Sequence, residues 1–145
     1  LLGILVQTGA EEILFRGYMQ QQLAARFRSG IAWAIVPSIL FGFAHFDVAT
    51  AGANAPLIVL SAGLFGLIAA DLTARTGSIG AAWGFHFANN TLALTLIATD
   101  GTLTGLALYK TPYAVSDTEA MRMALPFDLL MVSLSGWVIR RVLGR

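Results

Sequence analysis

The sequence has 145 residues, of which 57% are hydrophobic and 12% are charged, and its formal net charge is +1. A soluble domain carries about 25% charged residues, so this composition excludes an ordinary soluble protein and indicates an integral membrane protein. The small net charge does not indicate nucleic-acid binding, and the lack of cysteine excludes disulfides and cysteine catalysis. We expect a single all-α membrane bundle over residues 1–145.

Five apolar segments predict helices, at residues 1–27, 31–46, 56–74, 78–99 and 124–143. Several are shorter than the about 20 residues that cross a bilayer, so we expect tilted, partly re-entrant or interior helices among them. In the long connection at 100–123, Ser116 and Glu119 have the spacing of a capping box, which predicts a short helix there. The sequence opens on Leu1 inside an apolar run, and we expect preceding transmembrane helices to be missing from it.

The basic residues indicate how the helices are oriented. One side of the predicted bundle carries six arginines, at the first and third turns and the C-terminus: Arg26, Arg28, Arg75, Arg140, Arg141 and Arg145. The other side carries Lys110 and Arg122. Because cytoplasmic loops are enriched in basic residues, we expect the C-terminus to be cytoplasmic.

The first apolar segment contains three charged residues, Glu11, Glu12 and Arg16. Charges at bilayer depth are expensive, so each suggests a function. Glu12 and Arg16 share a helix face at i,i+4 in the favoured order, which predicts a structural ion pair. Glu11 lies about 100° further round the helix and has no expected local partner, so we assign the chemistry to it.

Both histidines of the chain, His45 and His86, also lie in apolar segments, and Asn90 shares a helix face with His86. Since every polar group in lipid needs a partner, we expect these three side chains to meet Glu11 at one interior site. A carboxylate near a histidine can activate water as a general base, and a second imidazole with an amide can donate to an oxyanion. Such a set suits hydrolysis of a peptide bond.

A metal site is the alternative chemistry for the same residues. Two histidines and a glutamate can bind a divalent metal such as zinc and leave a position open for water. The ligands would be Glu11, His45 and His86, without the HExxH spacing, since the histidines are 41 positions apart (86 − 45). The residues leave open whether the chemistry needs a metal cofactor or none.

Three motifs occur in order in these segments: Glu11-Glu12-x-x-x-Arg16, Phe41-x-x-x-His45 and His86-x-x-x-Asn90. Together they resemble the motif set of the CPBP (or Abi) family of intramembrane proteases, the CAAX prenyl endopeptidase and bacteriocin-processing family. The resemblance covers residues 9–90 and includes the turn at residues 70–79. Each motif alone is weak, but three in order within apolar helices are specific.

The resemblance implies an all-helical membrane endopeptidase whose substrate is a peptide or protein, either CAAX-like and prenylated or of the leader type. It implies three pairs of roles: water activation by Glu11 and His45, oxyanion stabilisation by His86 and Asn90, and support by Glu12 and Arg16. The partners expected are this substrate and the lipid bilayer, and no nucleic acid. We expect the membrane to be the plasma membrane of a prokaryote.

Plainer interpretations compete with these. Glu11 would be an interhelical acid that holds the bundle, the histidines would be buried core residues, and Asn90 would join helices. The alternative function is a non-catalytic immunity or scaffold protein that binds a peptide in the same cavity. A proton or ion transporter is disfavoured, because the sequence shows no obvious inverted repeat.

Overall fold

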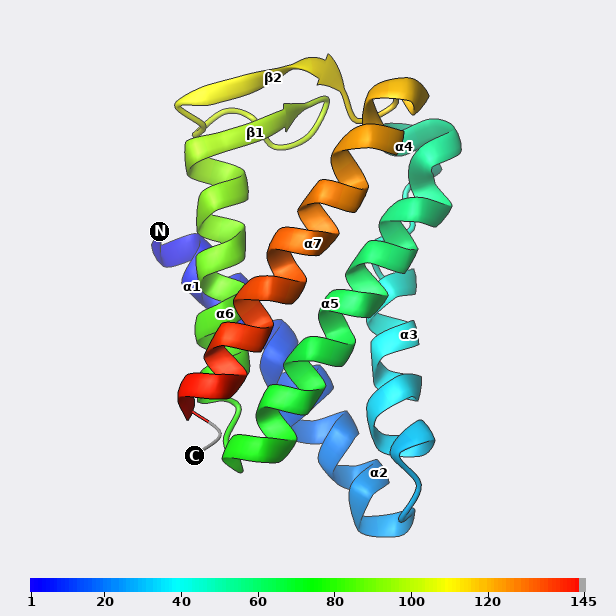
Figure 1. Ribbon diagram of the computed structural model, residues 1–145, viewed down its shortest axis with the longest axis vertical. Helices are drawn as coiled ribbons and strands as arrows, with labels where there is room; N and C mark the ends of the chain where they lie inside the picture. The colour runs from blue at the N-terminus through cyan, green and yellow to red at the C-terminus, as the bar shows by residue number, and fades with distance from the viewer. Residues whose placement is uncertain (144–145) are drawn as a thin grey trace.

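The computed structural model describes residues 1–143, most of which are helical. In chain order the elements are α1 (Leu2–Glu12), α2 (Gln20–Arg26), α3 (Val36–Phe43), α4 (Val48–Ala51), α5 (Ala55–Thr76), α6 (Gly80–Thr91), β1 (Ile97–Asp100), β2 (Tyr109–Ala114) and α7 (Thr118–Leu143). Short helical segments of other types adjoin some of these helices. Three are π-helical, at Ile13–Met19, Ile31–Ile35 and Leu92–Leu96, and one is a 3₁₀ helix, at Gly52–Asn54. The helices α3, α5, α6 and α7 run roughly along the long axis, and the strands cross one end (Figure 1).

A buried polar stripe runs along the first helical stretch, from α1 through α2. A polar residue recurs at every fourth position, and each is 4% exposed or less: Thr8, Glu12, Arg16 and Gln20. Residues four apart share a helix face, and part of this face packs on α5. There Arg16 and Gln20 donate to the backbone carbonyl oxygens of Gly66 and Ala70, at 3.2 and 3.1 Å. The stripe therefore faces protein, where polar groups find partners, instead of lipid.

Small residues bring α3 close to α5. A Cβ added at Gly42 would lie 2.5 Å from the carbonyl oxygen of Val59, and one at Gly66 would lie 3.2 Å from Ser38. Close backbone approach at small residues is how helices pack tightly in lipid. Aromatic and aliphatic side chains fill the interior that these helices enclose: Phe15, Phe41, Phe65, Leu72 and Phe85. This core supports one wall of the cavity described below.

The chain is not entirely α-helical, because β1 and β2 form a two-stranded parallel sheet. The helix that the sequence predicts over residues 78–99 ends at Leu96, and the following residues are extended. β1 pairs with β2 from Ile97 opposite Tyr109 onward. A short apolar run cannot be assigned to helix or strand by periodicity alone, and here pairing with β2 decides it. The expected all-α class is therefore correct for most of the chain and wrong here.

The last helix begins earlier than the sequence predicts. α7 starts at Thr118, where Asp117 caps it by accepting hydrogen bonds from the backbone N–H groups of Glu119 and Ala120, each at 3.1 Å. A carboxylate that accepts such bonds satisfies N–H groups that a helix end leaves free. The cap predicted at Ser116 is displaced by one residue, and the helix that follows is the long α7 instead of a separate short one.

Among residues 1–143, two helices are long and apolar enough to cross a bilayer. They are Val48–Thr76, with a mean hydropathy of 2.0 over its most apolar window, and Thr118–Leu143, with 1.3. The apolar helix Ile31–Phe43 is shorter than a span. The structure therefore does not confirm five membrane spans. It describes two candidate spans packed with shorter or more polar helices.

The two ends of the molecule differ in charge. The turn after α2, the turn between α5 and α6, and the described end of α7 lie at the end opposite the strands (Figure 1). This end includes most of the arginines from the predicted basic side: Arg26, Arg28, Arg75, Arg140 and Arg141. Arg145 lies outside the described residues. The grouping of basic turns at one end agrees with the sequence prediction, while the side of the membrane that it faces stays a prediction.

Candidate active site

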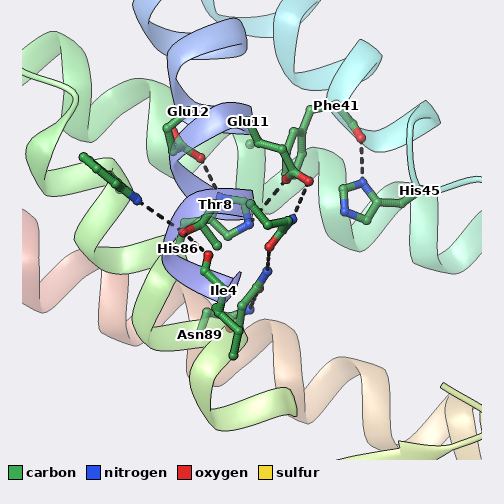
Figure 2. Close-up of polar contacts among 12 residues, drawn as sticks. Ile4, Thr8, Glu11, Glu12, Phe41, His45, His86 and Asn89 are labelled. Atoms are coloured by element: carbon green, nitrogen blue, oxygen red, sulfur yellow. Dashed lines mark hydrogen bonds and ion pairs between the residues drawn. The ribbon is translucent and has the colours of Figure 1, made fainter. Parts of the chain in front are cut away.

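His86 lies between two carboxylates where α6 crosses α1 (Figure 2). Its imidazole is 3% exposed, with Nδ1 2.8 Å from Glu12 Oε1 and Nε2 3.6 Å from Glu11 Oε2. A carboxylate can only accept, so Nδ1 is the nitrogen that donates to Glu12. This bond fixes the ring plane and directs Nε2 toward Glu11.

Glu12 joins this imidazole to the interior of the fold. The same atom, Oε1, accepts a hydrogen bond from Arg16 Nη1 at 3.0 Å, and both side chains are almost fully buried. The Arg16 guanidinium also stacks 4.6 Å from the centre of the Phe41 ring. The predicted ion pair is thus present. The contact of Glu12 with His86 was not predicted, and it means that the pair orients a site residue as well as supporting the helix.

Glu11 has a local partner that the sequence analysis missed. Its Oε1 accepts a short hydrogen bond from Nε2 of Gln7, one turn earlier on α1. The Gln7 Oε1 in turn accepts from Asn90 Nδ2 at 3.2 Å. The other carboxylate oxygen, Glu11 Oε2, is buried and has no hydrogen-bond partner among the described residues. Glu11 therefore has one oxygen held by Gln7 and one free oxygen that faces His86.

His45 lies just after the end of α3 and is exposed, and its ring and the His86 ring both contact the Phe41 ring. The ring centroids are 4.7 Å apart for Phe41 and His45 and 5.7 Å apart for Phe41 and His86. His45 Nδ1 donates to the carbonyl oxygen of Phe41 at 2.9 Å, so Nε2 is the nitrogen left for a ligand. In the view of Figure 2 the Glu11 carboxylate is drawn between the two imidazoles.

One cavity joins three of the four residues to which the sequence analysis assigns chemistry. Its volume is ≈190 Å³, and its walls include His45, His86 and Asn90. The remaining walls are two polar residues, Ser61 and Asn89, and apolar side chains from α3, α5 and α7: Phe41, Ile58, Ala62, Phe65 and Leu125. Glu11 is not among the lining residues, and it is joined to the cavity through its contacts with His86 and Gln7.

The structure does not assemble the alternative metal site. Within residues 1–143, no three His, Asp or Glu side chains are grouped closely enough to hold a metal ion. Nδ1 of His86 and Nδ1 of His45 are occupied by a carboxylate and a backbone carbonyl, so Nε2 is the nitrogen left on each ring. In the described chain Glu11, His45 and His86 are not grouped as the ligands of one metal, and the use of a metal in the reaction stays a prediction.

The contact between α1 and α6 depends on a glycine. A Cβ at Gly9 would lie 2.7 Å from the Trp83 ring, closer than real side chains pack. The indole N–H of Trp83 donates to Thr8 Oγ1 at 3.2 Å and to the carbonyl oxygen of Leu5 at 3.3 Å. This contact sets the crossing that brings Glu12 to His86. Sequence patterns could not reveal this contact, because the partners are about 75 residues apart.

Two carboxylates in contact with the buried imidazole of His86, beside a cavity that the exposed imidazole of His45 also lines, define a candidate hydrolytic site in a membrane protein. Residues 1–92, which contain all three motifs, match the protein family described as Type II CAAX prenyl endopeptidase Rce1-like. The chain belongs to this family, and the resemblance to the CPBP family is confirmed. By its description, this family is one of endopeptidases.

The chain also resembles a protein of Bacillus subtilis (strain 168), the "Uncharacterized protein YyaK". The two are 31% identical over 90 residues, which are 62% of this chain and 30% of the relative. The match thus spans less than a third of the relative's length. No solved structure matches the chain.

Proposed function

We propose that this protein is an intramembrane endopeptidase in which Glu11 and His45 activate water and His86 and Asn90 stabilise the oxyanion. The observation that carries the proposal is the free oxygen of Glu11. Glu11 Oε2 is buried, is without a hydrogen-bond partner in the described chain and lies 3.6 Å from His86 Nε2. A buried acceptor without a partner is unfavourable unless something such as water occupies the space beside it.

The attack on the peptide bond begins at this oxygen. Glu11 Oε2 takes a proton from a water molecule, while Nε2 of His45 accepts the other hydrogen and orients the water. The water oxygen bonds to the carbonyl carbon of the scissile peptide, and the carbonyl electron pair moves onto its oxygen. When the tetrahedral intermediate collapses, the C–N bond breaks and the proton on Glu11 passes to the leaving nitrogen. The products are a carboxylic acid and an amine, and the Glu11 carboxylate is regenerated.

The oxyanion needs donors aimed at the place where negative charge develops. His86 already donates from Nδ1 to Glu12, so it serves as a donor through Nε2 when the ring carries both protons. The Asn90 amide nitrogen has two N–H groups, and its described hydrogen bond to Gln7 uses one of them. The remaining N–H is available to the oxyanion. Both residues line the same cavity, where a substrate carbonyl would enter.

The family and the charge distribution support the finer features of the substrate and the location that we propose. We infer a membrane-associated substrate, either CAAX-like and prenylated or of the leader type. We also infer that the arginine-rich end faces the cytoplasm of a prokaryotic cell, with the protein in its plasma membrane. Family membership favours a protease over the non-catalytic immunity or scaffold protein, which no specific contact in the described chain supports.

The test is the variant Glu11→Gln in the full-length protein, purified in detergent and reconstituted into liposomes. Cleavage of a fluorogenic peptide that carries a CAAX-like end is measured, with a leader-type peptide as a second substrate. Loss of a general base lowers the rate by about 10²–10⁴-fold, and we expect a loss in this range. Thermal unfolding should stay close to that of the parent, because a glutamine preserves the shape of the side chain. Undiminished cleavage by Glu11→Gln would remove the proposed base.

A further inference from the structure

We propose that Gln7 is a positioning residue that orients both the general base Glu11 and the oxyanion donor Asn90; this inference rests on the proposed function. Gln7 lies on α1, one helical turn before Glu11 and outside the three sequence motifs. It also lines a second, larger cavity of ≈910 Å³, which shares Asn90 with the smaller one. Gln7 therefore lines the larger cavity and bonds to Asn90, which lines both.

The carboxamide of Gln7 uses its two ends for two different tasks. Its nitrogen donates to Glu11 Oε1, and its oxygen accepts from Asn90 Nδ2 at 3.2 Å. An amide can do both at once, whereas a carboxylate only accepts and an ammonium only donates. The two partners lie on different helices, so this one side chain connects the base on α1 to the donor on α6.

Glu11 needs such a tether. Its side chain is 30% exposed, so packing alone does not hold the carboxylate in one rotamer. With Oε1 bound to Gln7, Oε2 becomes the oxygen that faces His86 and is left without a partner in the described chain. Without Gln7, rotation about the side-chain torsions would spread the carboxylate over several orientations. A loss of orientation lowers the catalytic rate more than it changes substrate binding.

Asn90 is held from both sides of its amide. Its nitrogen donates to Gln7, and its oxygen accepts from Asn89 Nδ2 at 3.2 Å. These two bonds determine which end of the amide is nitrogen and which is oxygen. An Asn90 amide turned by 180° would present a carbonyl where the oxyanion needs a donor. Gln7 therefore sets the polarity of this group as well as its position.

The experiment compares Gln7→Leu, which keeps the bulk of the side chain and removes both hydrogen bonds, with Gln7→Glu, which replaces the donor by a negative charge. Gln21→Leu, at an exposed glutamine of α2, is the matched control. We expect kcat to fall about 10–100-fold in both Gln7 variants with KM within about threefold, because an interaction that acts in the transition state changes kcat. The control should retain the parent values.

A double-mutant cycle tests whether Gln7 acts by orienting Asn90 or has an effect that does not depend on Asn90. If Gln7 acts in part through Asn90, Gln7→Leu combined with Asn90→Ala should lose less activity than the two single effects added together, since coupled residues are not additive. Fully additive losses, a change in KM alone, or parent-like kcat in both Gln7 variants would overturn the inference. Glu11→Gln is measured in parallel. If that variant cleaves normally the proposed function fails, whereas if it is inactive and Gln7→Leu is normal, only the role of Gln7 fails.

Discussion

The buried pair of Glu12 and Arg16 leads to a prediction in which a double variant recovers stability but not activity. Both side chains are at most 2% exposed, and Glu12 Oε1 accepts two bonds, from Arg16 at 3.0 Å and from His86 at 2.8 Å. Removing one partner of a buried pair leaves an uncompensated charge and costs about 3–5 kcal/mol. Arg16→Met should lower the free energy of unfolding by this amount, and Glu12→Leu by a similar amount.

The double variant should behave differently in the two measurements. Replacing both members of a buried pair by apolar residues of similar size is often nearly neutral. We therefore expect Glu12→Leu/Arg16→Met to recover at least half of the summed destabilisation, measured by unfolding in mixed detergent micelles. Cleavage should stay low, because His86 Nδ1 no longer has its carboxylate. Single variants that each cost less than about 1 kcal/mol, or a double variant that regains full activity, would refute the reasoning.

Two further predictions concern the helix crossing and the orientation. Gly9→Val should separate α1 from α6, because even its Cβ would lie 2.7 Å from the Trp83 ring, and overpacking of this kind costs about 1–3 kcal/mol. Gly3→Val on the same helix, where a Cβ would meet no described atom within 4 Å, is the control for thermal unfolding and cleavage. A reporter fused to the C-terminus should be active only in the cytoplasm, and a periplasmic signal would reverse the assigned orientation.

The residues that carry charge or imidazole could be picked out from the sequence because their surroundings are apolar. Glu12 with Arg16, and His86 with Asn90, also lie four apart, so their shared helix faces follow from helix geometry alone. The pairing of Glu12 with Arg16 needs no information from the rest of the fold. That is why the sequence predicted it correctly.

Contacts between helices could not be predicted in this way. Gln7 is one polar residue near the start of an apolar run, and its bond to Asn90 depends on how α1 crosses α6, 83 positions along the chain. The same crossing gives Glu12 its second bond, to His86. The end of the helical run at Leu96 could not be predicted either, because residues 97–100 suit either a helix or a strand until β2 is placed beside them. Local patterns thus identified the chemical groups, and the packing of distant segments determined their partners.

The sharing of a single oxygen atom, Glu12 Oε1, by Arg16 and His86 has a consequence for mutagenesis screens. Random libraries sorted for expression level and libraries sorted for turnover should be depleted of the same substitutions at Glu12. A relative that keeps this acid and the arginine has been selected at least for the ability to fold, so their retention alone is weak evidence of turnover. Evidence for an active enzyme has to come from Glu11, whose described bonds lie within the candidate site.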